Sequence, residues 1–300
     1  MANSFGSVLF SVALIGTGSA VFHPEASKIA WLGSGGKRGL AQSIFQVGGN
    51  FGSAIGPLLA ALFIVPFGLG HISYFGLLAI AAIGVLIYIG RWARHYLRSL
   101  KSRKTTTSAE PIHNIPKRTV RISIGILLVL IFSKYIYLTS ITSYYTFFLI
   151  EKFNVSIQAS QLYLFAFLAA AAIGTYVGGP IGDRYGRKYV IWFSILGTAP
   201  FSLALPYANL FWTVVFSIMA GLILSSAFSA ILVYAQELMP GKIGLVSGLF
   251  FGFAFGVGGV GSALLGMLAD IRDVYFVYFL CSFFPLIGLI TWKLPNLRYA

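Results

Sequence analysis

A short charged turn carries the most chemically distinctive residues of this sequence. Residues 179–188 read Gly-Pro-Ile-Gly-Asp-Arg-Tyr-Gly-Arg-Lys and lie between two long apolar stretches. One carboxylate, Asp183, is followed closely by three cationic side chains, Arg184, Arg187 and Lys188. A carboxylate and a guanidinium form a strong hydrogen-bonded ion pair, which can hold one conformation and break in another. We therefore expect a gate at this turn; the alternative is that the charges only anchor the loop in water.

A single lysine interrupts another apolar stretch. Lys134 lies about midway along residues 121–145, and burying a cation at the centre of a membrane helix costs roughly 2.5–3.5 kcal/mol. Such a residue indicates function, and we expect a substrate cavity around it. The polar side chains that follow at helical spacing are expected to share the cavity: Tyr137, Ser140, Tyr144 and Tyr145. The alternative is a lysine that reaches water or backbone carbonyls and binds no substrate.

The composition identifies the elements that must position these residues. Of 300 residues, 58% are hydrophobic and 9% are charged, whereas about a quarter of a soluble domain is charged. A membrane-spanning helix needs about 20 mostly apolar residues, and the sequence predicts nine, at 4–22, 41–64, 72–91, 121–145, 158–178, 189–206, 209–233, 244–268 and 273–292. The predicted fold class is therefore an all-α polytopic membrane protein.

The net charge of +14 raises the question of a nucleic-acid partner. The positions of the basic residues exclude it, because 18 of the 21 Lys and Arg fall on one side of the predicted topology. That side holds Lys28, Lys37, Arg38, the nine basic residues of 91–121, Arg184, Arg187, Lys188, Lys242, Lys293 and Arg298. Since basic residues mark the cytoplasmic side, we expect a cytoplasmic C-terminus.

The predicted domains follow from the basic segment 91–121, which contains one acid, Glu110. It predicts a cytoplasmic linker at 93–119 between a partial N-terminal bundle of three spans, 1–92, and a C-terminal six-helix bundle, 120–300. The linker charges are expected to set the membrane orientation, with binding to anionic lipid as the alternative.

An internal repeat relates the two parts. Gly36-Lys37-Arg38-Gly39-Leu40 matches Gly241-Lys242-Ile243-Gly244-Leu245 at a constant offset, 241 minus 36, or 205. The chain is therefore expected to be a duplication. In the second half, three predicted spans precede the span that leads to the landmark at 241–245. In the first half, no span precedes the equivalent span, which leads to the landmark at 36–40. The repeat thus predicts that about three spans are missing from the first half.

A polar line lies on the first repeated helix. Gln42, Gln46 and Asn50 recur every four residues, whereas the second copy places Ser247, Phe251 and Phe255 there. This asymmetry between the copies indicates a role in substrate selectivity. Hydrogen bonding between helices is an equally good explanation.

The charged turn resembles the loop motif of the major facilitator superfamily. The matching positions are Gly179, Asp183, Arg184, Gly186, Arg187 and Lys188. The resemblance implies two six-helix halves joined by a cytoplasmic loop, of which this chain supplies the spans equivalent to four through twelve. If the halves pack as in that family, Glu25 and Glu237 end equivalent spans beside the charged turn and complete the gate.

Longer segments closely resemble the fosmidomycin resistance proteins of bacteria, namely 21–27, 39–50, 132–135 and 234–240. This resemblance implies a secondary transporter in the cytoplasmic membrane that exports a phosphonate drug in exchange for protons. Lys134 would suit such an anionic drug or metabolite electrostatically. Glu25 with His23 is then the expected proton acceptor, unless that acceptor belongs to the missing helices.

The remaining expectations concern partners and alternatives. With four scattered His and one Cys, the sequence offers no catalytic cluster and no cofactor or metal site. The expected partners are a small-molecule substrate, protons and the lipid bilayer. The alternative function is a transport-inactive remnant of such a transporter, which predicts no efflux.

Overall fold

The computed structural model describes residues 4–102 and 115–297, and the described parts are helical throughout. The middle of the linker expected at 93–119 and Arg298 lie outside these ranges. In the N-terminal part the helices are α1 (Phe5–Leu32), α2 (Arg38–Leu59), a π-helical turn (Ala60–Ile64), α3 (Val65–Phe67), a 3₁₀ segment (Leu69–Phe75) and α4 (Gly76–Ser102). They continue with α5 (Lys117–Phe153), α6 (Ile157–Tyr185), α7 (Arg187–Leu196), α8 (Ala199–Ala204), a 3₁₀ turn (Leu205–Tyr207), α9 (Leu210–Ser225), α10 (Ala227–Leu238), α11 (Ile243–Ile271), α12 (Val274–Cys281) and a 3₁₀ segment (Phe284–Lys293).

Among the described residues, nine helical segments are long and apolar enough to cross a membrane. They confirm the nine predicted spans and the all-α class. Several extend beyond their predicted bounds; α1, for example, continues through Pro24 to Leu32, because helical hydrogen bonding does not stop where the apolar residues end. Likewise α4 runs on to Ser102 and α5 begins at Lys117, so both described ends of the expected linker are helical.

Local chemistry explains where the central helices stop. Asn154 ends α5 in the left-handed conformation, with φ of 52°, which asparagine tolerates better than most residues. Two residues later the Ser156 hydroxyl accepts a hydrogen bond from the Ala159 N–H and begins α6. Gly186, with φ of 105°, separates α6 from α7, since a residue with a Cβ would be strained there. These breaks fold α5, α6 and α7 back on one another.

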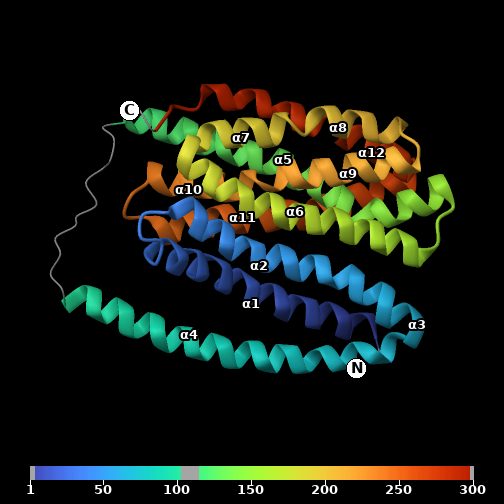
Figure 1. Cartoon of the computed structure of the whole chain (residues 1–300), viewed down its shortest axis with the longest axis horizontal. Helices are drawn as coiled ribbons and strands as arrows, with labels where there is room; N and C mark the ends of the chain where they lie inside the picture. Colours follow the sequence, from blue (N-terminus) through green and yellow to red (C-terminus); the bar gives the residue numbers. More distant parts are fainter. Residues whose placement is uncertain (1–3, 103–114, 298–300) are drawn as a thin grey trace.

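The hydrophobic core lies in the C-terminal part. Large side chains such as Leu127, Phe148, Phe167, Phe228 and Phe250 are fully or almost fully buried between these helices. The N-terminal part joins them mainly where α2 packs on α6 and α1 packs on α11, and α2 also touches α10. In Figure 1, α1 and α2 lie along this bundle and α4 runs along the margin of the molecule. Some of the expected site residues meet at the seam between the two parts.

Candidate functional site

The charged turn lies at the end of α6 and joins side chains from both halves. The Arg187 Nη2 lies 2.9 Å from Asp183 Oδ1 and 3.2 Å from Glu237 Oε1, at the end of α10. Glu237 Oε1 is also 3.4 Å from Arg38 Nη1, at the start of α2. These four side chains, here called the charged cluster, are at most 29% exposed, so water screens them only in part. The end of the helices on which they lie is called the charged end.

Asp183 also binds the main chain of the other half. Its two carboxylate oxygens accept hydrogen bonds of 2.9 Å from the Gly39 and Leu40 N–H groups. These groups belong to the first turn of α2, where N–H groups lack partners within the helix and carry partial positive charge. One carboxylate thus holds an arginine of its own half and a helix N-terminus of the other.

The close approach of α2 and α6 depends on two glycines. A Cβ on Gly39 would lie 2.6 Å from the Gly179 carbonyl oxygen and 2.7 Å from Asp183 Oδ1. A Cβ on Gly179 would run into Ser43 and the Gly39 carbonyl oxygen. Gly179, which the motif contributes, is therefore needed so that the two backbones can touch.

The other expected gate residues have different partners. Lys188 donates to the carbonyl oxygens of Trp292 and Leu294, at 2.9 and 2.5 Å, and so ties α7 to the C-terminal segment. The Arg184 guanidinium lies over the Tyr185 ring, 5.2 Å from its centroid. Neither side chain bridges the halves.

Glu25 does not join the charged cluster, although its repeat equivalent does. Its carboxylate is 62% exposed and lies 3.5 Å from Lys28 Nζ, on its own helix. Arg38, which the sequence placed among the basic residues of one side and in the repeat but not in the gate, takes part instead. The signal in the sequence that could have identified Arg38 is its position at the start of α2, next to the Gly39 landmark.

A small cavity lies between the halves at the level of Lys134. Its volume is about 110 Å³. Helices α2, α5 and α6 contribute most of its lining, and α10 with the residue at the end of α9 completes it: Gln46, Asn50, Ser53, Lys134, Tyr135, Leu138, Thr142, Leu168, Ala171, Thr175, Ser225 and Phe228. The structure therefore brings three predicted residues together, Gln46, Asn50 and Lys134.

Lys134 is 4% exposed and has aromatic neighbours. Its ammonium lies 5.1 Å from the Phe228 ring centroid and 5.6 Å from that of Tyr135, within the range of cation–π attraction. In the described ranges no carboxylate lies within 4.0 Å of it. The cavity thus contains a cation without a neutralising partner.

A hydrogen bond joins the halves beside this lysine. The Asn50 side-chain N–H donates to Thr175 Oγ1 over 2.7 Å, from α2 to α6. The Thr175 hydroxyl in turn lies 2.9 Å from the Ala171 carbonyl oxygen on its own helix. Because Asn50 and Thr175 both line the cavity, this bond links a cavity wall of one half to a wall of the other.

The remaining predicted substrate residues lie elsewhere. Tyr137 and Ser140 are buried in the C-terminal core, and the Tyr145 hydroxyl is paired with Ser217 at 2.9 Å. Tyr144 donates to the Ser262 carbonyl oxygen of α11 at 2.5 Å. The predicted stripe therefore shares only Lys134 with the cavity, and its other members lie on a different side of α5.

The cavity face of α5 comprises Tyr135, Leu138 and Thr142 together with Lys134. Lys134, Leu138 and Thr142 recur every four residues, which is also helical spacing. Spacing alone did not distinguish the two stripes.

Gln42 is not in the cavity either. It is fully buried one turn nearer the charged end and bonds to Ser27 of α1.

The expected proton acceptor His23 lies on the seam among aromatic rings. Its ring centroid is 4.9 Å from that of Phe255 and 5.3 Å from that of Phe251, both on α11, and 6.0 Å from that of Phe45 on α2. Its Nδ1 lies 3.0 Å from the Ser19 carbonyl oxygen. Glu25 contributes nothing to this environment, so the structure does not pair the two expected proton carriers.

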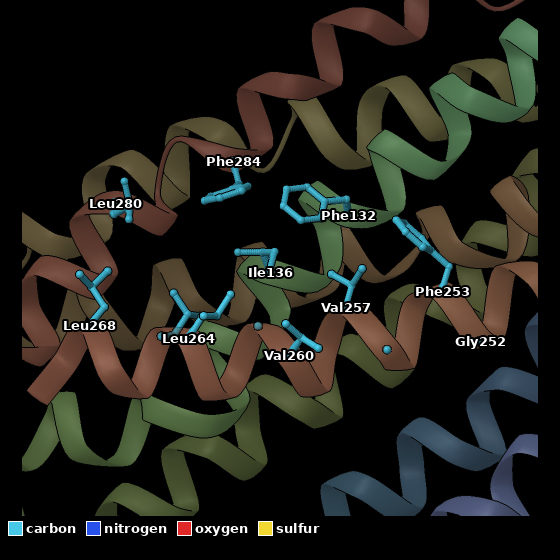
Figure 2. A pocket seen from close by; sticks show the side chains of 13 residues that line it. Phe132, Ile136, Gly252, Phe253, Val257, Val260, Leu264, Leu268, Leu280 and Phe284 are labelled. Atoms are coloured by element: carbon cyan, nitrogen blue, oxygen red, sulfur yellow. The ribbon is translucent and has the colours of Figure 1, made fainter.

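A larger hollow of about 570 Å³ lies along α11, beside α5 and α12. Figure 2 shows its wall, in which rings such as Phe132 and Phe284 and aliphatic side chains such as Leu264 surround an apolar space. All of its lining residues are apolar, so it offers an anion no partner. The described residues likewise contain no group of three His, Cys, Asp or Glu that would hold a metal ion. The cavity at Lys134 is therefore the candidate binding site.

Comparison with known proteins places this arrangement in a family. Residues 126–298 match the Major Facilitator Superfamily. The chain is 58% identical over 299 residues to the fosmidomycin resistance protein of Escherichia coli (strain K12), covering 100% of this chain and 73% of that protein. It is 43% identical over 297 residues to the uncharacterized MFS-type transporter YfnC of Bacillus subtilis (strain 168), covering 98% and 72%.

A more distant relative is a probable sugar efflux transporter of Helicobacter pylori (strain J99), 28% identical over 72% of this chain and 54% of its own length. These relatives are transporters rather than enzymes, and they do not favour the inactive remnant. The family and the nine apolar helices indicate a multi-pass bacterial membrane protein. The chain belongs to the Major Facilitator Superfamily of transporters.

Proposed function

We propose that the protein exports small anionic molecules and binds them at the cavity around Lys134. The observation that carries this proposal is the buried ammonium of Lys134, which faces a partly polar cavity between the halves and has none of the described carboxylates within 4.0 Å. In surroundings of low polarity an uncompensated cation attracts an anion strongly. The E. coli relative is named for resistance to fosmidomycin, and a phosphonate of this kind has the charge that such a site suits.

The size of the cavity bears on how a substrate enters. Its volume of about 110 Å³ is below the roughly 300 Å³ at which pockets for drug-sized ligands begin. Binding therefore requires the halves to move apart around the Asn50–Thr175 bond. Such movement is what alternating access between two halves supplies.

We assign the charged cluster to the gate on the cytoplasmic side, and the C-terminus to the same side of the bacterial cytoplasmic membrane. The support is the excess of Lys and Arg at this end of the spans, which marks the cytoplasmic face. In the closed gate Asp183 holds the start of α2, and Arg187 and Arg38 share Glu237. Opening this side breaks the contacts that cross the seam.

Protons are the proposed coupling ion, with His23 as their carrier on the seam and Glu25 as the exposed group that exchanges them with water. An imidazole can accept and release a proton, and His23 contacts rings of both halves, so a proton on His23 would lie where the halves separate. In proteoliposomes, His23→Gln is expected to abolish uptake driven by a pH gradient but to retain substrate binding. Unchanged gradient-driven uptake would remove His23 from the coupling step.

The substrate assignment is tested with Lys134→Met, which keeps the length of the side chain and removes its charge. The matched control is Lys117→Met, on the same helix but exposed at its start. Purified variants are titrated with fosmidomycin by calorimetry, and export is measured in cells. We expect Lys134→Met to weaken binding by at least a hundredfold and to abolish export, and the control to retain both.

Two other results would decide against the proposal. Normal binding by a well-inserted Lys134→Met variant would show that the anion binds elsewhere. Absence of export by the unsubstituted chain, with no binding, would favour the inactive remnant.

A further inference from the structure

Four polar side chains meet in the seam between the halves, apart from both the cavity and the charged cluster. Ser27 of α1 and Gln42 of α2 come from the N-terminal part, and Gln236 of α10 and Ser247 of α11 from the C-terminal part. Each is 0% exposed. We call them the seam quartet. None of the four has a part in the substrate site or in the ion pairs described above.

Hydrogen bonds connect all four. Within the N-terminal part, the Gln42 side-chain N–H donates to the Ser27 carbonyl oxygen at 2.7 Å, and the Ser27 hydroxyl donates to Gln42 Oε1 at 3.1 Å. Gln236 donates from the same nitrogen to Ser247 Oγ at 2.9 Å and, across the seam, to Ser27 Oγ at 3.3 Å. The Ser247 hydroxyl donates to the Ile243 carbonyl oxygen at 2.8 Å.

A count of hydrogens shows which residue makes the bridge. Each serine hydroxyl has one hydrogen; that of Ser27 points to Gln42 and that of Ser247 points to Ile243. The two hydroxyl oxygens lie 3.2 Å apart, but with this assignment no hydrogen remains to bond them. The amide of Gln236, with two hydrogens, is therefore the donor that joins the halves.

The same residue carries an unsatisfied group. Gln236 Oε1 is buried and has no hydrogen-bond partner. A buried polar atom without a partner is unfavourable, and it would gain a partner if water reached it. The quartet thus holds the halves together through one amide nitrogen, while the oxygen of that amide favours separation. Such a balance suits a contact that forms and breaks repeatedly.

We propose that the seam quartet is a lock between the halves, formed when the charged end is closed and broken when it opens, with Gln236 as the bridging residue. The inference rests on the proposed alternating access and adds a second closing layer behind the charged cluster. Because the quartet is fully buried, water and salt do not weaken it gradually, as they weaken a half-exposed ion pair. It therefore acts as an all-or-none contact.

Ser27→Ala is the sharpest test. It removes the hydroxyl that Gln236 and Ser247 face across the seam, but keeps the Gln42 bond to the Ser27 carbonyl oxygen and the Gln236 bond to Ser247. The matched control is Ser160→Ala, equally buried, whose hydroxyl bonds only to the Ile157 carbonyl oxygen of its own helix. Both variants lose the same atom, and only one loses a contact between the halves.

Spin labels report the opening of the charged end. Cysteines are placed at Lys37 and Lys242, which are exposed and equivalent in the repeat, in a Cys281→Ser background. Double electron–electron resonance on the full chain in nanodiscs then gives the populations of short and long distances. We expect Ser27→Ala to raise the ratio of open to closed molecules about tenfold, which corresponds to about 1.4 kcal/mol, and Ser160→Ala to leave it unchanged.

Equal populations in Ser27→Ala and Ser160→Ala would overturn the lock. If Ser27→Ala does not insert, Gln236→Leu decides in its place, because it removes the amide nitrogen that donates across the seam to Ser27. A shift toward open molecules supports the lock, and no shift overturns it. The measurement uses no substrate. Unchanged distances with intact export would overturn the lock alone, whereas shifted distances without export would overturn the proposed function alone.

Discussion

The hold of Asp183 on the first turn of α2 gives a prediction that is measurable by amide exchange at the start of this helix. Asp183→Asn keeps the size of the side chain but leaves one acceptor oxygen where there were two. The oxygen lost is either Oδ1, which accepts from the Gly39 N–H and from Arg187, or Oδ2, which accepts from the Leu40 N–H, and in both cases the negative charge is lost. The substitution therefore weakens all three contacts and removes at least one.

The magnitude follows from the type of bond. Hydrogen bonds to a charged group contribute about 1.5–3 kcal/mol each, and Asp183 and Arg187 are only 20% and 16% exposed. Loss of one helix bond and of the ion pair to Arg187, taken at the lower limit, amounts to about 3 kcal/mol. At about 1.4 kcal/mol per tenfold change, the opening equilibrium of this turn shifts by roughly two orders of magnitude.

Hydrogen–deuterium exchange followed by mass spectrometry is the assay, read on peptides that cover the start of α2. We expect the Gly39 and Leu40 amides to exchange about a hundredfold faster in Asp183→Asn. Asp273→Asn is the matched control, because Asp273 caps the start of α12 through the Phe276 N–H and takes no part in the gate. Equal exchange at the start of α2 in both variants would refute the argument that Asp183 holds this helix.

Two further predictions concern the same seam. Gly179→Ala places a methyl group against Ser43 and the Gly39 carbonyl oxygen, so we expect the melting temperature to fall by several degrees and export to be lost. The control is Gly48→Ala, whose methyl group meets nothing within 4 Å among the described atoms and is expected to change neither. Equal melting temperatures of the two variants would contradict the close packing of α2 and α6. Glu237→Gln removes the shared partner of Arg187 and Arg38, so a cysteine placed at Gln46 should react several times faster with an impermeant maleimide added at the charged end. The control is Glu25→Gln, because the Glu25 carboxylate is exposed and takes no part in the charged cluster. Equal labelling rates in the two variants would exclude Glu237 from the gate.

Local sequence signals were sufficient for the elements themselves. Nine apolar stretches predicted nine spans because a membrane helix must satisfy its own backbone and present apolar side chains over its whole length. The family also followed from sequence, since the charged turn is a short, local motif. Both properties depend on neighbouring residues in the chain.

The choice among faces of a helix depended on packing between helices. On α5, the stripe of Tyr137 and Ser140 and the stripe of Leu138 and Thr142 both follow Lys134 at helical spacing, of three and four residues. Only the approach of α2 and α6 to one side of α5 places Lys134 in a cavity with the second stripe.

The two repeat-equivalent glutamates show the same limit. Glu237 is enclosed by arginines of both halves and Glu25 faces outward, although their sequence positions correspond. The sequence by itself determined the spans and the presence of a lysine within one of them. The tertiary structure alone decided which side chains surround that cation and which carboxylates close the seam, because those contacts join segments far apart in the chain, as in the pairs Gly39–Asp183, Asn50–Thr175 and Arg38–Glu237.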